Sequence, residues 1–248
     1  MKGSAFLAEW FAKVKADFIL NFVTGDRWSL ILNGLIVTLK ITVVAIFIGI
    51  AIGIILATIR STYDMTRNEN RSGFKQSLLS FLNSLAKIYL TVIRGTPVVL
   101  QLLIIYFVIF ASSDNGVLIA ALAFGINSGA YVAEIIRGGI MSIDRGQMEA
   151  GRSLGFNYFE TMRYIIIPQA FKNVLPSLAN EFIALLKETS VAGYVAVQDL
   201  TRAGNIIRSK TYSAFMPLVA VALIYLAMVM VLTYFVGILE RRLRNSER

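Results

Sequence analysis

The chain has 248 residues, of which 56% are hydrophobic, and it carries a formal net charge of +9 without cysteine or histidine. These absences exclude disulfides, thiolate and imidazole chemistry, and the usual zinc ligands. Apolar residues fall in long blocks such as the uncharged stretch 41–59, which at about 1.5 Å per residue matches the roughly 30 Å core of a bilayer. We therefore expect an all-α integral membrane protein, whose excess of Lys and Arg belongs to cytoplasmic loops and not to a nucleic-acid surface.

The N-terminal segment 1–28 is expected to form an amphipathic helix. Leu7, Phe11, Val14 and Phe18 recur at helical spacing and share one face. Charged residues interrupt the segment and exclude the apolar core of a signal peptide. Such a helix is typical of a segment that lies at the membrane interface.

The region 29–240 is predicted to contain about five membrane spans. The second span is expected to break at Arg94-Gly95-Thr96-Pro97, because proline lacks a backbone donor and disfavours helix before it. The fourth is expected to break at Pro176 and at Lys187-Glu188-Thr189. The predicted spans are Ser29–Ile59, Leu78–Phe110, Val117–Ile140, Gln169–Val197 and Ala214–Leu239.

Small residues recur at every fourth position in two of these spans, which favours close helix packing, since lipid provides little hydrophobic drive for helix association. The first and third spans carry these stripes, at Ala45, Gly49, Gly53 and Ala57 and at Ala121, Gly125, Gly129 and Ala133.

The placement of basic residues predicts the orientation. The loops after the first and third spans and the tail 241–248 are basic, so we expect them in the cytoplasm, with the N-terminus outside. Arg202, Arg208 and Lys210 fall in an outside loop and oppose this pattern. The polar insert 63–75 has no assigned role.

The loop 141–168 is predicted to form two short helices on the cytoplasmic side. Asp144 is expected to cap the first helix, with Gln147 reaching back to it, and Gly155 suits the left-handed position that ends a helix. Asn157 and Glu160 predict a second capped helix that ends at Pro168. From the spacing alone, the loop is either a docking surface or a surface hairpin with no partner.

Several motifs of this chain resemble those of one transporter family. Glu149-Ala150-Gly151, Gly155 and Ile167-Pro168 resemble the cytoplasmic EAA-type loop in the membrane subunits of ATP-binding-cassette (ABC) importers. The polar amino-acid permease branch (histidine/glutamine/arginine type) is indicated by further motifs, namely Arg94–Pro97 with Gln101-Leu102, Ala130–Ile140, Gly146-Gln147 and Ile167–Ala170.

The resemblance spans about Asn33 to Arg244 and implies the type I importer permease fold in a bacterial cytoplasmic membrane. It implies pairing with a second permease subunit, a copy or a related chain, docking of cassette ATPase subunits, and delivery of a polar amino acid by an extracytoplasmic binding protein. The chain lacks a phosphate-binding Gly-x-x-x-x-Gly-Lys-Ser/Thr loop. ATP and Mg are therefore expected in the partner ATPases, with no cofactor, metal or catalytic residue in this chain, which is not itself an enzyme.

The resemblance assigns ATPase coupling to the loop residues. Gly151 stands where the family usually has alanine, and because glycine weakens a helix by about 1 kcal/mol, a slightly looser docking helix is expected. The coupling residues are Glu149, Ala150, Gly151, Ser153, Leu154, Gly155 and Pro168.

Ionisable residues inside spans usually face a bundle interior or an aqueous cavity. A zwitterionic amino acid needs an acceptor for its ammonium group and donors for its carboxylate, which a broken membrane helix can supply. The alternative for Glu134 is pairing with Arg137, three residues on. The hypothetical substrate pathway comprises Arg94, Thr96, Asn127, Ser128, Glu134 and Glu181.

Two other classes of function compete with the importer subunit. An autonomous ion-coupled secondary transporter or channel would need no ATPase, and the docking loop argues against it. A membrane enzyme is disfavoured by the missing histidine and cysteine and by the lack of carboxylates at metal-ligand spacing. The sequence leaves open which amino acid is carried and which permease chain holds its site.

Overall fold

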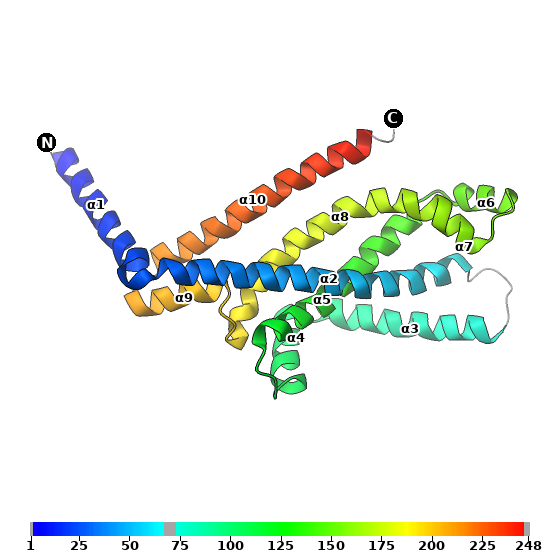
Figure 1. The fold of residues 1–248 in the computed structure, drawn as a ribbon, viewed down its shortest axis with the longest axis horizontal. Helices are drawn as coiled ribbons and strands as arrows, with labels where there is room; N and C mark the ends of the chain where they lie inside the picture. The colour runs from blue at the N-terminus through cyan, green and yellow to red at the C-terminus, as the bar shows by residue number, and fades with distance from the viewer. Residues whose placement is uncertain (1, 67–72, 246–248) are drawn as a thin grey trace.

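The computed structural model describes residues 2–66 and 73–245, which form helices joined by short connections (Figure 1). Part of the polar insert 63–75 lies outside the described residues. The α-helices are α1 (Lys2–Phe18), α2 (Trp28–Thr66), α3 (Phe74–Gly95), α4 (Val98–Ile104), α5 (Gly116–Met141), α6 (Arg145–Ser153), α7 (Tyr158–Thr161), α8 (Ile167–Glu188), α9 (Leu200–Thr211) and α10 (Phe215–Asn245). Short π-helical and 3₁₀ segments (η1–η5) connect some of them.

Five long elements run alternately between the two ends of the molecule (Figure 1). These are α2, α3, α5, α8 and α10. The α6–α7 hairpin lies at one end, here called the hairpin end, and the tip of α9 lies at the other, here called the α9 end. Among the described residues, α2, α5 and α10 are long and apolar enough to cross a membrane, and α3 with its bent continuation adds a fourth. Since α8 does not meet this test, the expected number of five spans stays a prediction.

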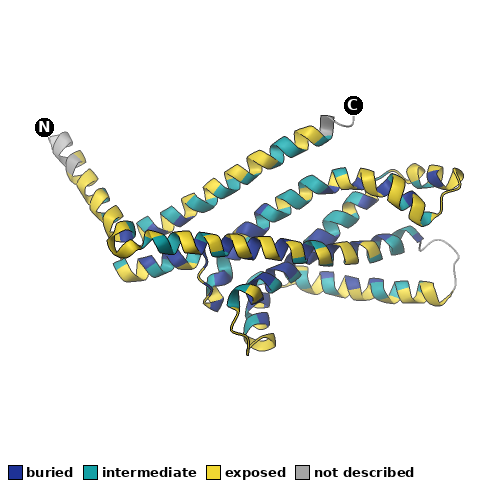
Figure 2. Ribbon diagram, in the orientation of Figure 1, coloured by how far each residue is buried: buried dark blue, intermediate teal, exposed yellow. Residues whose placement is uncertain are grey.

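The centre of the fold is the contact between α2 and α5, where the two predicted small-residue stripes face each other. A Cβ on Gly125 would lie 2.7 Å from Ile48, and a Cβ on Gly49 would lie 3.1 Å from the Ser128 hydroxyl. The dark blue stretches of Figure 2 follow this contact. The stripes therefore let the two backbones approach closely, as the sequence predicts.

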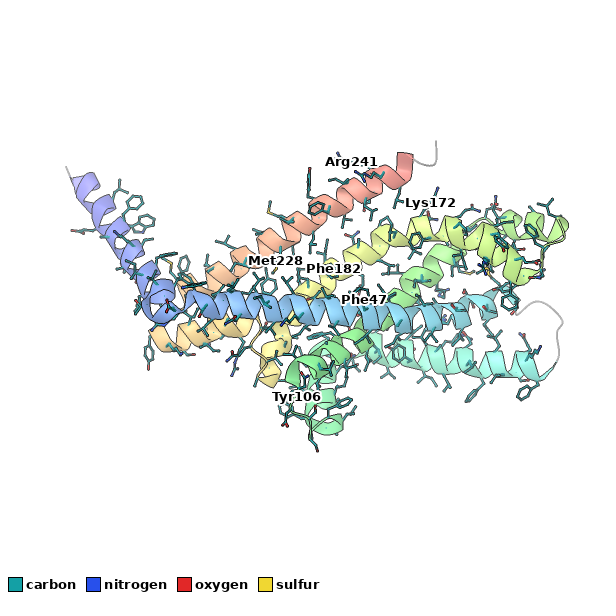
Figure 3. The ribbon with its side chains drawn as sticks, viewed as in Figure 1. Phe47, Tyr106, Lys172, Phe182, Met228 and Arg241 are labelled. Atoms are coloured by element: carbon teal, nitrogen blue, oxygen red, sulfur yellow. The ribbon has the colours of Figure 1, made fainter. Side chains whose placement is uncertain are left out.

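The outer helices are much less buried than this centre. In its most apolar stretch, α10 is 11% buried, against 67% for α5. An open apolar groove of about 290 Å³ between α8 and α10 is lined by Phe182 and Phe235 among others, and Figure 3 shows Phe182 and Met228 between these two helices.

Proline acts differently from expectation in α8. Pro176 lies within the helix and does not break it, while Pro168 begins α8 and does not end a second hairpin helix. Pro168 lies just after the π segment Met162–Ile166, and the chain stays helical across it. At Pro176 the helix continues because α8 packs along α5, with Val174 against Gly139. The helix does end at Glu188, as predicted.

Helix α1 extends away from the bundle at the α9 end (Figure 1). Its Leu7, Phe11 and Phe18 side chains are exposed. The connection Ile19–Asp26 is fixed by the buried Asn21, whose amide donates to Ser213 Oγ at 3.3 Å and accepts from Thr211 Oγ1 at 2.8 Å. The helical prediction for this segment is confirmed, while its place at a membrane interface stays a prediction.

Candidate functional site

The first helix of the hairpin, α6, has defined signals at both ends. Asp144 caps it by accepting a hydrogen bond from the Gly146 amide at 2.6 Å. At its other end Gly155 has a φ of +88°. The Phe156 amide donates to the Gly151 carbonyl and the Gly155 amide to that of Arg152, at 3.1 and 3.0 Å. This is the Schellman pattern of a glycine-terminated helix, as the sequence predicts.

The second half of the hairpin runs directly into α8. Asn157 and Glu160 form the predicted capping box, with the Asn157 side chain accepting from the Glu160 amide at 3.0 Å and the Glu160 side chain accepting from the Asn157 amide at 2.8 Å. The chain stays helical through a π segment, Met162–Ile166, to the start of α8. A force on the hairpin therefore reaches α8 without an intervening flexible loop.

Gly151 is a close-contact position between the two halves of the hairpin. It is buried, and a Cβ there would lie 2.6 Å from Thr161 Cγ2. Thr161 is itself fully buried. Glycine thus allows α6 to pack tightly on α7, so the expected looser helix is offset by closer packing. The cost of this contact is that glycine has a lower helix propensity than alanine.

The other predicted coupling residues lie on the outside of the hairpin. Glu149, Ala150, Ser153 and Pro168 are exposed. Two large apolar side chains beside them, Leu154 and Phe159, are 76% and 79% exposed. Apolar side chains of this size at the end of a bundle are typical of an interaction surface. The arrangement presents a negative charge next to an apolar patch on a rigid support.

The predicted break between α3 and α4 is present and sharp, with a bend of 107°. The carbonyls that the bend frees are bound by Gln101, whose Nε2 donates to the Ile93 carbonyl at 2.7 Å and the Thr96 carbonyl at 3.1 Å. Asn127 donates to Gln101 Oε1 at 2.8 Å. Thr96 and Asn127 are thus joined through Gln101, which satisfies polar groups that apolar surroundings would penalise.

A second predicted pair joins α5 to α8. The Ser128 hydroxyl donates to Glu181 Oε1 at 2.7 Å. Ser128 is fully buried, and Glu181 is partly buried. The pair places a carboxylate acceptor at the centre of the bundle, on the helix that continues from the hairpin.

Glu134 belongs to an ionic cluster with α2. It accepts from Arg60 at 3.3 Å and from Arg137 at 3.0 Å, and Arg137 also pairs with Asp64 at 3.3 Å. The alternative of Glu134–Arg137 pairing is therefore confirmed. Arg60 and Asp64 complete a clamp between α2 and α5 towards the hairpin end.

Arg94 and Glu134 line one open pocket of about 530 Å³, together with Lys87 and Arg60. The Arg94 guanidinium lies over the Tyr131 ring at 5.6 Å. The six pathway residues thus divide into three groups: Ser128 with Glu181, Thr96 with Asn127, and Arg94 with Glu134. Sequence reasoning did not assign Gln101 or Arg60 to the pathway, although Gln101 stands in one of the family motifs. The signal for Gln101 was an amide in an apolar run four residues after Pro97.

Comparison with known proteins resolves the alternatives. Residues 49–245 match the family model described as the binding-protein-dependent transport system inner membrane component. The chain belongs to this family. It is the permease subunit of an ABC importer, an integral protein of the cytoplasmic membrane.

Relatives of this permease are named for amino-acid transport. It is 37% identical over 230 residues (92% of this chain, 98% of the relative) to a putative glutamine transport system permease of Rickettsia bellii. It is 37% identical over 220 residues (88% and 94%) to the arginine transport system permease ArtQ of Bacillus subtilis. It is 39% identical over 178 residues (70% and 81%) to the glutamine permease GlnP of Escherichia coli.

Solved structures agree with the fold of the permease. A crystal structure of an amino acid ABC transporter with histidines matches with a TM-score of 0.77 and 41% identity, covering 89% of this chain and 98% of that one. An inward-facing MetNI methionine ABC transporter matches with a TM-score of 0.74 at 17% identity, covering 88% and 98%. The second likeness concerns the fold alone.

Proposed function

We propose that this permease carries a polar L-amino acid into the cell and is driven by cassette ATPase subunits that dock on the α6–α7 hairpin. The observation that carries the proposal is the hairpin itself: capped at both helix starts, closed by Gly155, and continuous with α8, which bears Glu181. Closure of the ATPases on ATP would push on α6 and move α8 against α5. The permease contributes no catalytic residue, and ATP and Mg are held by its partners.

The proposed assembly contains a second permease subunit, two ATPases and an extracytoplasmic binding protein. The hairpin end faces the cytoplasm and the α9 end faces outward. Basic residues such as Arg60, Arg145 and Arg241 at the hairpin end support this orientation. The N-terminus is then outside and the C-terminus inside.

For the substrate, we propose that Glu181 receives the ammonium group, and that Arg94, in the separate pocket with Glu134, attracts the carboxylate at another stage of the passage. The names of the glutamine and arginine permeases among its relatives support a polar amino acid. Ser128 holds the Glu181 carboxylate in place at 2.7 Å. Uptake of radiolabelled glutamine and arginine into proteoliposomes that hold the full complex tests this role. Glu181→Gln is expected to reduce uptake at least tenfold at normal expression, and unchanged uptake would contradict it.

The docking is tested by affinity capture of the tagged permease from its own membranes. Glu149→Lys is expected to reduce the co-purified ATPase at least tenfold, because it reverses a charge at the centre of the exposed face. The matched control is Glu240→Lys, which changes the net charge by the same amount at an exposed position near the C-terminal end of α10. Equal ATPase recovery from both variants would place the docking elsewhere, and a folded wild type without ATPase would contradict the importer mechanism.

A further inference from the structure

Three cations at the α9 end are not explained by the hairpin or the membrane pathway. Arg202, Arg208 and Lys210 are all exposed on α9. Basic residues are normally depleted from outside loops. None of the three forms an ion pair within the described part of the chain. Asp199, the N-cap of this helix, is buried.

Stabilisation of the helix accounts for only part of this charge. Arg208 and Lys210 lie in the last turn of α9, where cations favour the helix dipole. Arg202 lies in the first turn, where a cation opposes it. The helix dipole therefore does not explain all three positive charges on the exposed surface of α9. A surface of one charge sign attracts a partner of the opposite sign.

The cations are held on a rigid support. The opposite face of α9 buries Leu200, Ala203 and Ile207 against α2 and α10. The Leu200 amide donates to Thr38 Oγ1 of α2 at 3.0 Å. Asn21 fixes the far end of α9 through Thr211 and Ser213. A preorganised surface of this kind loses little conformational freedom when a partner binds.

An exposed aromatic residue in an uncommon conformation ends the helix. Tyr212 has a φ of +53° and its side chain is 97% exposed. The left-handed region is unfavourable for a bulky residue, and such strain concentrates at functional sites. Tyrosine is also enriched at protein interfaces. No described contact of Tyr212 within the chain explains why a glycine does not occupy this position.

The C-terminal end of α9 lies at the end of the bundle opposite the hairpin (Figure 1). It packs beside Asn21, just before the start of α2 at Trp28. The predicted first span begins at Ser29, and residues 28–39 carry no charge, so the far end of α9 lies beside the outer end of that span. A soluble partner can reach the exposed face of α9 there.

We propose that the exposed face of α9, with Arg202, Arg208, Lys210 and Tyr212, is the docking surface for an acidic patch on the extracytoplasmic binding protein. The family description names dependence on a binding protein. Because the exposed surface of α9 is basic, the matching surface of that protein is expected to be acidic. The inference rests on the proposed orientation and function. It assigns a second interface to the permease, at the end opposite the ATPase hairpin.

The test uses the complete transporter in nanodiscs with its own purified, substrate-loaded binding protein. The measured quantity is the binding-protein concentration that gives half-maximal stimulation of ATP hydrolysis. Arg208→Glu/Lys210→Glu is expected to raise it about tenfold at low salt, with a smaller difference at high salt. Lys13→Glu/Lys15→Glu on exposed α1 changes the net charge equally and is expected to leave the concentration unchanged.

A second variant separates docking from folding. Tyr212→Gly suits the left-handed backbone, so it is expected to keep or raise the melting temperature while weakening stimulation severalfold. If both α9 variants respond to the binding protein as the wild type does, the inference is wrong. In that case, anionic lipid is the partner if Arg208→Glu/Lys210→Glu sediments less with phosphatidylglycerol vesicles than the wild type and Tyr212→Gly do. Without stimulation of the wild type, the proposed function fails as well.

Discussion

The contact between α2 and α5 and the exposed helix α10 show two ways in which one chain uses apolar surface. In α5, 67% of the most apolar stretch is buried within the chain, whereas in α10 the share is 11%. Both helices are long and apolar enough to span a membrane, yet only α5 carries a stripe of small residues that meets a matching stripe. The comparison indicates that α2 and α5 form the internal frame, while α10 leaves its surface to lipid or another subunit.

A glycine-to-alanine pair gives the largest expected difference between the two regions. Gly53→Ala would place a Cβ against Val132 of α5, whereas Gly237→Ala on α10 meets nothing within 4 Å. We expect Gly53→Ala to destabilise the permease by about 1–3 kcal/mol through overpacking. Gly237→Ala is expected to be neutral or to stabilise by up to about 1 kcal/mol through helix propensity. Melting temperatures in detergent measure both, and similar values for the two variants would remove the distinction.

The next largest effect on stability is expected from the polar contacts of Gln101 at the bend between α3 and α4. Gln101→Leu keeps the side-chain size but leaves the carbonyls of Ile93 and Thr96 without their amide donor, at an expected cost of about 1–3 kcal/mol. The bend between α3 and α4 should also loosen, with slower uptake. Gln76→Leu, at a partly exposed position near the start of α3, is the matched control. Wild-type stability in Gln101→Leu would mean that water replaces the amide.

The smallest effect concerns α9, which joins the frame to α10. Burial raises the pKa of Asp199, although the amides of Arg202 and Thr201 oppose this. Its contribution to stability is therefore fully present below the unfolded pKa of about 3.9 and is lost as the pH rises through the folded pKa.

Asp199→Asn should keep the helix cap and remove this pH dependence. Its stability is expected to match that of the wild type near pH 4 and to exceed it at pH 7, where the buried Asp199 carboxylate is charged. Asp114→Asn in an exposed loop is the control. Melting temperatures measured from pH 4 to pH 7 test this prediction. If the melting temperature changes with pH equally in Asp199→Asn and in the wild type, the assignment to Asp199 is wrong.

Local signals in the sequence predicted most of the hairpin, although Gln147 accepts a hydrogen bond from Gln169 at 3.4 Å instead of reaching back to Asp144. Asp144, Gly155 and the pair Asn157 and Glu160 act through the backbone within a few residues, so their roles do not depend on the rest of the fold. The glycine stripes were also readable, because spacing along one helix determines which residues share a face. Their partners across the interface, however, follow only from the three-dimensional arrangement.

The errors concern residues whose effect depends on distant contacts. Pro176 was expected to break α8, but packing against α5 keeps the helix continuous. The expectation that Gly151 loosens α6 stays a prediction, and its contact with Thr161 was not visible in the sequence. The pathway residues stay a prediction, but the sequence did not show that Gln101 binds Thr96 and Asn127 or that Arg60 binds Glu134.

Because α8 is continuous with the hairpin, a tilt of its hairpin end displaces residues farther along the helix. Glu181 lies 14 residues, or about 21 Å along the axis, from Ile167 at the hairpin end. A tilt of about 10° at that end would displace Glu181 by roughly 4 Å at this rise per residue. That displacement exceeds the 2.7 Å between Glu181 and the Ser128 hydroxyl. In the proposed mechanism, a small tilt at the membrane surface would therefore be enough to break this internal hydrogen bond and leave the Glu181 carboxylate free to bind a solute.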